Sequence, residues 1–304
     1  MLNTYLITGA NAGLGKETAK QLALKSDTKK IYLGCRNRDK ALMAQKELEM
    51  ETGKFVFEIV DIDVSNLESV KAAVVALPEP VDALVMNAGG VVGSTFHELN
   101  KDGVTQIFAV NLLGHTVLTE ELIKAGKLTK VAIYAGSEAA RGVKEMGMQR
   151  PDFPSSSTQD FLDLSKGALY GHKKDATVPY GPIKYMAALW ISAMAREYKE
   201  IRFVTMSPGA TAGTEGFNTL SPLKQFFMKS MMKMMLMLGK VHGVKVGAKR
   251  FVDALLDTSY KSGGFYASEK GLTGKIGDQS KLFEDLANTK FQDNAKSAID
   301  KLAA

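Results

Sequence analysis

Tyr180 and Lys184 are the pair of residues in this chain whose types and spacing suit acid–base chemistry. They stand four residues apart, so on a helix their side chains lie on one face. A tyrosine ordinarily has a pKa of about 10, and a neighbouring ammonium favours the phenolate and lowers that pKa. Tyr180 can then give a proton to a substrate oxygen or take one from it. The same spacing also suits a partly exposed pair on an ordinary amphipathic helix.

A glycine-rich segment near the start of the chain suits phosphate binding. Thr8-Gly9-Ala10-Asn11-Ala12-Gly13-Leu14-Gly15 follows an apolar run and precedes a periodic segment. Its glycines let the backbone turn tightly, and the next helix directs free N–H groups and its dipole at an anion. Such glycines also occur in structural turns, but a place between a strand and a helix is the context in which they bind a dinucleotide.

Arg36 indicates which dinucleotide the chain binds. The second apolar run ends in Gly34-Cys35-Arg36-Asn37-Arg38. A site for NAD normally has an acidic residue here to hold the ribose hydroxyls, whereas the guanidinium of Arg36 matches a phosphate in a bidentate way. Lys16 and Arg38 are its expected neighbours. The sequence therefore predicts NADP(H), with a solvated arginine in a charged loop as the alternative.

Asp63, which follows the third apolar run, has two interpretations. Its carboxylate can accept a hydrogen bond from an adenine amino group, or it can support the start of the next helix at Ser65. Both interpretations remain open. The helix start itself, Ser65-Asn66-Leu67-Glu68, is predicted to be a capping box.

The elements that must position these residues alternate along the chain. Strands are expected at Tyr5–Thr8, Lys30–Gly34, Phe55–Val60, Ala83–Met86, Lys130–Tyr134 and Arg202–Met206. Helices are expected at Gly15–Leu24, Asp39–Glu51, Leu67–Ala76, Gly103–Leu122 and Tyr180–Lys199. This alternation predicts a doubly wound α/β fold, a parallel sheet with helices on both faces. The continuous apolar runs fit strands that are buried on both sides.

Residues 1–304 are expected to form a single domain with two insertions, at about 138–179 and 211–243. The first insertion is irregular and contains three prolines, and the second contains a methionine-rich helix. Both follow strand ends, where ligands bind in folds of this kind. We therefore interpret them as parts of the active site rather than as separate domains.

The composition argues against several other classes of protein. The net charge is +6, but basic and acidic residues are interleaved and no aromatic–basic motif appears, so nucleic-acid binding is not expected. The basic surface attracts anions, including phosphorylated cofactors. The four histidines (His97, His115, His172 and His242) lack the spacing of metal ligands, so no metal site is predicted.

Cysteine content and the apolar runs predict a cytoplasmic protein. Cys35, the single cysteine, cannot form an intrachain disulfide, which fits a reducing compartment, and we expect it to pack near a strand end. The first apolar run begins at Tyr5 and leaves no room for a signal or transit peptide. The sequence has no stretch of about 18 uncharged apolar residues, so a membrane-spanning helix is not expected.

Six motifs together resemble those of the short-chain dehydrogenase/reductase family, over nearly the whole chain. They occur in the family's order: the TGxxxGxG motif at Thr8–Gly15, the NAG motif at Asn87-Ala88-Gly89-Gly90, the catalytic asparagine at Asn111, the serine that ends the fifth strand at Ser137, the YxxxK motif at Tyr180–Lys184, and the proline–glycine motif at Ser207-Pro208-Gly209. The resemblance implies a Rossmann fold. It also implies an enzyme that moves a hydride between NADP(H) and a carbonyl, an alcohol or a conjugated double bond.

The resemblance also implies a role for each matched residue. Tyr180 is the acid or base, and Lys184 also holds the nicotinamide ribose. Ser137 hydrogen-bonds the substrate oxygen, and Asn111 positions a water that relays protons to Lys184. The residues expected to bind the cofactor are Thr8, Gly9, Asn11, Gly13, Leu14, Gly15, Arg36, Asp63, Asn87, Ala88, Gly89, Tyr180, Lys184, Pro208, Gly209 and Thr211.

Two narrower branches of the family share further features with this chain. Gly34–Arg36 and Asn111–His115 look like retinol dehydrogenases, whereas the long segment from Ser137 to Tyr180 and the tail through 262–266 look like light-dependent protochlorophyllide reductase. The chain departs from that reductase: Gly-Pro-Ile replaces Lys-Asp-Ser at 181–183, Ala210 stands in place of a cysteine, and position 213 is glycine where the family has a threonine. Chlorophyll chemistry is therefore the second choice. A non-catalytic NADP(H)-binding regulator is the alternative of another class, although it would be expected to lack the tyrosine or the lysine.

The methionine-rich segment Phe226–Leu238 has three interpretations. Methionine is flexible and adapts to irregular apolar shapes, so the segment suits a lid over a bulky apolar substrate. It also suits a helix on a membrane surface with snorkelling lysines, or a subunit contact or plain core. The oligomeric state stays open. In the helix that carries Tyr180, the predicted core face is Ile183, Met186, Ala187, Trp190, Ile191 and Met194.

Overall fold

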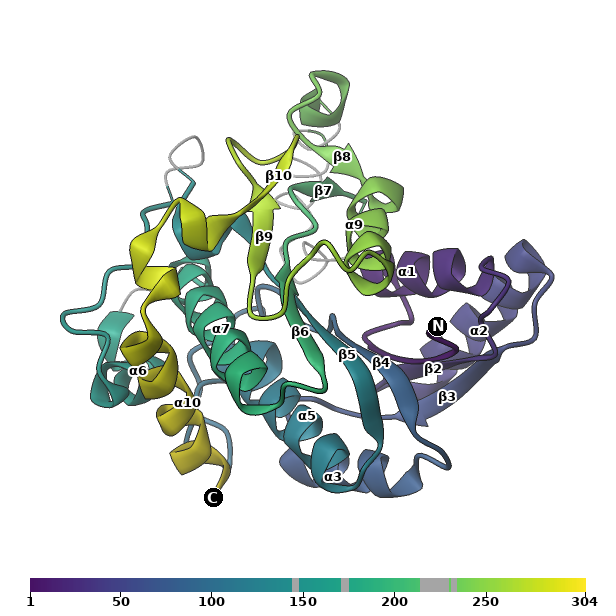
Figure 1. Ribbon diagram of the computed structural model, residues 1–304, viewed down its shortest axis with the longest axis horizontal. Helices are drawn as coiled ribbons and strands as arrows, with labels where there is room; N and C mark the ends of the chain where they lie inside the picture. The colour runs from purple at the N-terminus through teal and green to yellow at the C-terminus, as the bar shows by residue number, and fades with distance from the viewer. Residues whose placement is uncertain (144–147, 171–174, 214–229, 231–233) are drawn as a thin grey trace.

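The protein is built around an eight-stranded sheet (Figure 1). The computed structural model describes residues 1–143, 148–170, 175–213, 230 and 234–304. The strand order is β10-β9-β6-β5-β4-β1-β2-β3, and all neighbours are parallel except the antiparallel pair of β9 and β10. The strands are β1 (Thr4–Thr8), β2 (Lys30–Cys35), β3 (Phe57–Asp61), β4 (Val81–Met86), β5 (Leu128–Ala135), β6 (Arg202–Met206), β9 (Phe265–Ser268) and β10 (Ile276–Asp278).

Helices cover both faces of the sheet, as a doubly wound fold requires. The helices α1 (Gly13–Ala23), α2 (Arg38–Thr52) and α9 (Val244–Leu256) pack on one face. The helices α3 (Leu67–Ala76), α5 (Gly114–Lys124) and α7 (Thr177–Glu197) pack on the other. The last helix, α10 (Thr289–Ala303), lies along α7 and beside α6 (Thr158–Ser165). The predicted fold class is confirmed.

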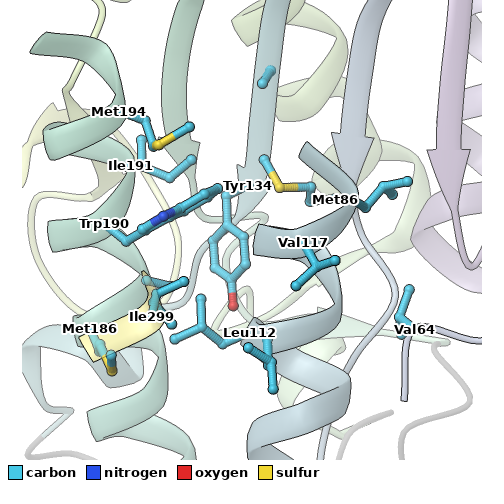
Figure 2. Packing of buried hydrophobic residues seen from close by; sticks show 14 of the residues in the cluster. Val64, Met86, Leu112, Val117, Tyr134, Met186, Trp190, Ile191, Met194 and Ile299 are labelled. Atoms are coloured by element: carbon cyan, nitrogen blue, oxygen red, sulfur yellow. The ribbon is translucent and has the colours of Figure 1, made fainter. Parts of the chain in front are cut away.

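The alternation of side chains along the strands creates a separate hydrophobic core on each face. In β1, Tyr5 and Ile7 belong to one core and Leu6 belongs to the other, because successive side chains of a strand point to opposite faces. Figure 2 shows the second core, in which Tyr134 of β5 lies among residues of α7 and α5. All six residues predicted as the core face of α7 are fully buried there.

The predicted strands and helices largely match the structure, with several differences. All six predicted strands are present as β1–β6, but the strands β9 and β10 and the helices α6, α9 and α10 were not predicted. The helix expected from Gly103 begins only at α4 (Gln106–Phe108) and continues through a π-helical turn, η1 (Ala109–Leu113), into α5.

The cap of α3 also differs: the helix begins at Leu67 as predicted, but the predicted capping box at Ser65 is wrong. The N-cap is Asn66, whose Oδ1 accepts hydrogen bonds from the backbone N of Glu68 (3.0 Å) and of Ser69 (3.5 Å). The Ser65 hydroxyl instead donates to Asp63 Oδ1 at 2.6 Å. Because the Ser65 hydroxyl is engaged with Asp63, the cap is Asn66, one residue after the predicted one.

The two expected insertions contain short elements of their own. Residues 138–179 include the 3₁₀ turn η2 (Glu138–Arg141), α6 and a second 3₁₀ turn, η4 (Ala168–Tyr170). The second insertion begins and ends at a parallel pair of short strands, β7 (Thr211–Ala212) and β8 (His242–Gly243). Most of the methionine-rich segment lies outside the described residues, but Met234 and Leu236–Leu238 are described and exposed. No helix within the described residues is long and apolar enough to cross a membrane.

Candidate active site

The predicted site residues meet at the carboxyl edge of the sheet. The glycine turn follows β1, Asn87 follows β4, Ser137 follows β5 and Pro208 follows β6. These four strands are parallel, and β1, β4, β5 and β6 are consecutive neighbours in the sheet. Their carboxyl ends therefore bring together residues that are far apart in the sequence.

The glycine turn leaves the amino end of α1 open to an anion. Gly9 and Gly13 have φ of 66° and 53°, a conformation that favours glycine. A Cβ on Gly15 would lie 2.4 Å from the backbone oxygen of Gly9, so only glycine fits there. The first turn of α1 has no acidic residue and no side-chain cap. The N–H groups of α1 are thus available to a phosphate, and this turn fits a dinucleotide.

Thr8 and Asn87 join the glycine turn to the loop after β4. Thr8 is fully buried, and its hydroxyl oxygen accepts hydrogen bonds from the backbone N of Asn87 and of Ala88, both at 2.9 Å. Asn87 Nδ2 donates to the backbone oxygen of Thr8 at 2.9 Å. These contacts use the polar atoms of Thr8 within the protein, so the Thr8 side chain positions the two loops rather than presenting itself at the surface.

Arg36 lies exposed at the end of β2, with its two expected neighbours engaged elsewhere. Lys16 pairs with Glu47, and Arg38 pairs with Asp61 at 2.6 Å. Within the described part of the chain, Arg36 has no carboxylate partner. Of the three cations Lys16, Arg36 and Arg38, Arg36 is therefore the one whose charged group is available for a phosphate.

Asp63 is used by the chain itself. Its Oδ1 accepts hydrogen bonds from the backbone N of Ser65 at 2.9 Å and from the Ser65 hydroxyl at 2.6 Å. Of the two interpretations for Asp63, the structure favours support of the turn before α3.

Lys184 lies one helical turn after Tyr180 and is buried against β5. The residue is 4% exposed, and Nζ donates to the backbone oxygen of Ala135 at 2.9 Å and to the Tyr134 hydroxyl at 3.2 Å. The Nζ atom lies 5.4 Å from the centre of the Tyr180 ring. Burial lowers the pKa of Lys184 to about 7, because removal from water disfavours the charged form.

The pKa of Tyr180 is shifted upward, whereas the sequence predicted a downward shift. Burial raises the pKa of Tyr180 to about 12, hydrogen bonding to Ser137 opposes that rise, and the Glu138 carboxylate adds to it. The expected lowering depended on a charged lysine and on the positive charge of an oxidised cofactor. Desolvation by burial is the largest cause of the shift, so Tyr180 is held as a protonated phenol at neutral pH.

Asn111 supports the site from the π-helical turn η1. Its Nδ2 donates to the backbone oxygens of Gly90 and Ile107, and its Oδ1 accepts from the backbone N of Gly90, each at 2.9 Å. A Cβ on Gly89 would lie 2.6 Å from that Oδ1. The Asn111 side chain therefore holds the loop after β4, while its backbone oxygen accepts a hydrogen bond from the Tyr134 hydroxyl at 2.6 Å.

A buried ion pair, which the sequence analysis did not identify, holds the segment after β6. Glu138 Oε2 accepts a hydrogen bond from the Ser207 hydroxyl at 2.5 Å, and Oε1 accepts from the Ser268 hydroxyl at 3.0 Å. Arg250 of α9 lies 3.7 Å from the same carboxylate, and both charged side chains are buried. Through Ser207 and Ser268, Glu138 joins the segments at the ends of β5, β6 and β9.

The remaining predicted residues border the same edge. Asn11 and Leu14 are half-buried in the glycine turn. Gly209 has φ of 74°, and the Thr211 hydroxyl donates to its backbone oxygen at 3.0 Å. Within the described residues there is no group of three or more His, Cys, Asp or Glu that could hold a metal ion.

Comparisons with known proteins agree with this architecture. A family model described as short chain dehydrogenase matches residues 3–141. The chain is 30% identical over 285 residues to protochlorophyllide reductase B of Oryza sativa subsp. japonica, covering 87% of this chain and 69% of that protein. It is 26% identical over 287 residues to the short chain dehydrogenase yanD of Aspergillus niger, covering 90% and 83%. Human retinol dehydrogenase 13 is 37% identical over only 123 residues, covering 40% and 36%.

Solved structures share the fold at low sequence identity. The L-sorbose reductase of Gluconobacter frateurii, complexed with NADPH and L-sorbose, has a TM-score of 0.64 at 18% identity and covers 90% of this chain and 97% of its own. An NADPH-bound carbonyl reductase from chicken fatty liver has a TM-score of 0.59 at 18% identity, covering 90% and 99%. A 4-hydroxyisoleucine dehydrogenase complexed with NADH has a TM-score of 0.61 at 19% identity, covering 90% and 100%.

Proposed function

Because the chain belongs to the short-chain dehydrogenase/reductase family and uses a nicotinamide dinucleotide as that family does, we propose that it is an NADP(H)-dependent oxidoreductase acting on a carbonyl or alcohol carbon. One observation carries the proposal: Tyr180, Lys184 and Ser137 converge at the carboxyl edge of the sheet, next to the open amino end of α1. An acid, a cation and a hydroxyl donor are thus grouped beside a phosphate-binding turn.

These residues account for the proton transfer and the charge changes of such a reaction. NADPH, when bound, would supply the hydride to the carbonyl carbon. The Tyr180 hydroxyl would give its proton to the carbonyl oxygen, so that the two-electron reduction yields an alcohol and a phenolate. Lys184 would stabilise that phenolate, and the Ser137 hydroxyl would donate a hydrogen bond to the substrate oxygen. A tyrosine whose pKa is raised to about 12 is protonated at neutral pH, which suits reduction.

The choice of NADP(H) rests on Arg36. Its guanidinium is exposed at the end of β2, where an NAD-binding site normally has an acidic residue. An arginine there can pair with the 2′-phosphate that distinguishes NADPH from NADH. Lys16 and Arg38 are already paired, so they would add to the local positive field rather than bind the phosphate directly.

A screen of NADPH consumption tests the proposal. Bulky ketones, aldehydes and quinones would be offered with NADPH or NADH, and the change in absorbance of the reduced cofactor would be followed. We expect turnover of at least one class, with NADPH preferred. Failure of every carbonyl substrate, together with tight NADPH binding, would favour a non-catalytic regulator on the same fold.

A second candidate function is the reduction of a conjugated double bond. It is supported by the similarity to protochlorophyllide reductase B of rice, which extends over 87% of this chain, whereas the match to human retinol dehydrogenase 13 covers 40%. Tyr180 and Lys184 would then protonate carbon instead of oxygen. To separate the two candidates, turnover of a protochlorophyllide-type substrate would be compared in light and in darkness. Only the second candidate function predicts that this substrate is reduced, and that its reduction requires light.

A further inference from the structure

The buried amine of Lys184 contacts a tyrosine that the proposed reaction does not use. Lys184 Nζ donates to the backbone oxygen of Ala135 at 2.9 Å and to the Tyr134 hydroxyl at 3.2 Å. The Tyr134 hydroxyl lies 2.6 Å from the backbone oxygen of Asn111. A continuous chain of hydrogen bonds therefore runs from η1, through the side chain of Tyr134 in β5, to Lys184 in α7.

The chemistry of these groups fixes the direction of each bond. An ammonium has donors only, so the Tyr134 oxygen must accept from Lys184. A backbone carbonyl accepts only, so Tyr134 must give its one proton to Asn111. The two neighbours therefore favour one orientation of the Tyr134 hydroxyl, with its proton directed at the Asn111 carbonyl and a lone pair directed at the Lys184 amine.

We propose that Tyr134 is a positioning residue of this site: its hydroxyl joins the Asn111 carbonyl to Lys184 where a water was expected, and it helps to keep Lys184 charged. A water at that point would exchange with solvent, whereas Tyr134 is anchored in a central strand. The consequence for catalysis rests on the proposed function, but the effect on the charge of Lys184 does not.

The packing around Tyr134 supports this role. Tyr134 is fully buried, and Figure 2 shows its ring between Trp190 of α7 and Val117 of α5, with the hydroxyl directed toward the segment that carries Leu112. The Lys184 amine lies 4.6 Å from the centre of the same ring. The ring face and the hydroxyl oxygen thus both stabilise a positive charge at Lys184.

The other titratable groups near Lys184 do not replace Tyr134. Tyr180 lies on the same helix, and His115 of α5 has a pKa lowered to about 3 by burial and by the charge of Lys184, so it is neutral. Glu138 of η2 acts on Tyr180 and pairs with Arg250. In the described part of the chain, no carboxylate lies within 4.0 Å of the Lys184 amine. The charge is therefore supported by the two oxygen acceptors of β5 and by the Tyr134 ring.

The variant Tyr134→Phe tests the proposal, because it keeps the ring and removes only the hydroxyl. The pKa of Lys184 would be measured in the cofactor-free protein by NMR titration of ¹³Cε- and ¹⁵N-labelled lysine, with Lys184→Met to assign the signal. We expect the pKa of Lys184 to fall by about one unit, since a hydrogen bond to a charged group is worth roughly that much.

Tyr5→Phe is the matched control. Tyr5 is equally buried in a strand, and its hydroxyl also donates to a backbone oxygen, that of Leu2, at 2.8 Å. It lies at the amino end of β1, away from Lys184. We expect Tyr5→Phe to lower stability to a similar extent and to leave the pKa of Lys184 unchanged.

Two outcomes would overturn the proposal. One is a folded Tyr134→Phe protein in which the pKa of Lys184 equals that of the unaltered chain. The other, useful if the variant does not fold, is the absence of an NMR cross-peak between the Tyr134 hydroxyl proton and the Cε protons of Lys184 in the unaltered chain. A lowered pKa in a protein that reduces no substrate would leave this inference standing while the proposed function fails.

Discussion

Lys184 and Arg36 are the two cations on which the candidate site depends, and the chain holds them in opposite ways. Lys184 is buried against β5, with its amine on two oxygen atoms of that strand. Arg36 is exposed at the end of β2. Burial lowers the pKa of Lys184 to about 7, so its charge depends on its surroundings, whereas an arginine stays charged. Burial in the protein interior therefore sets the charge of Lys184 where the reaction is proposed to occur, whereas the selection of the cofactor relies on the exposed charge of Arg36.

The largest expected effect lies at the reacting end. Tyr180→Phe keeps the ring beside Lys184 but removes the proton that the reaction needs. We expect turnover to fall by about a hundredfold or more, the usual scale for general acid catalysis, with NADPH binding retained. Steady-state kinetics and a binding titration measure the two quantities. Tyr198→Phe, at the other end of α7, is the control and should behave as the unaltered enzyme. Normal turnover by Tyr180→Phe would place the proton donor elsewhere.

The buried charge of Lys184 should also appear in the pH dependence of stability. The folded pKa is about 7 and the usual value is 10.5, so between these values the unfolded chain binds a proton that the folded chain lacks. Stability should therefore rise with pH across this window. Relative to Lys184→Met, the unaltered chain should gain about 2 kcal/mol of unfolding free energy between pH 7 and pH 9.

Denaturant unfolding of both proteins at several pH values measures this difference, and effects of other groups cancel between them. A constant difference across the window would mean that Lys184 keeps an ordinary pKa in the folded chain. The distinction drawn between the two cations would then disappear.

A smaller effect is expected at the exposed end. Arg36→Asp removes one charge-assisted contact and adds repulsion. NADPH affinity should fall by about tenfold, or roughly 1.5 kcal/mol, while NADH affinity changes little. Lys290→Asp makes the same change of charge at the start of α10 and is the control for the overall field. Equal affinities of the unaltered protein for NADPH and NADH would contradict the role of Arg36.

The smallest and most local effect concerns residues 226–238. Met234 and Leu236–Leu238 are exposed, and exposed apolar groups of this kind often mark a contact surface. We expect amides of 226–238 to exchange rapidly in the NADPH complex and slowly once a large apolar substrate binds, as in closure of a lid. Hydrogen exchange measures this. Equal protection in both states would indicate core or a subunit contact, and protection only with lipid vesicles would indicate a membrane surface.

The fold was largely predictable because its signals are local. Apolar runs and helical periodicity identified the strands β1–β6, and the core face of α7 was assigned from the spacing of its apolar residues. β9 and β10 were missed, since they are only four and three residues long. β9 depends on pairing with β6, which is distant in the sequence, and within the described residues β10 pairs only with β9. The bounds of α3 were predicted correctly, but its cap was misplaced by one residue because Ser65 bonds to Asp63 rather than to the helix.

The order and types of residues determined which groups are available for the reaction: a tyrosine and a lysine on one helical face, a glycine turn before a helix, and an arginine where an acid is usual. Only the tertiary structure decided how those groups behave. Tyr134 meets Lys184 across 50 residues of sequence, and Ser268 meets Glu138 across 130. Neither contact has a local pattern, because each depends on which strands become neighbours. The direction of both pKa shifts at the site follows from burial, which is a property of the assembled core.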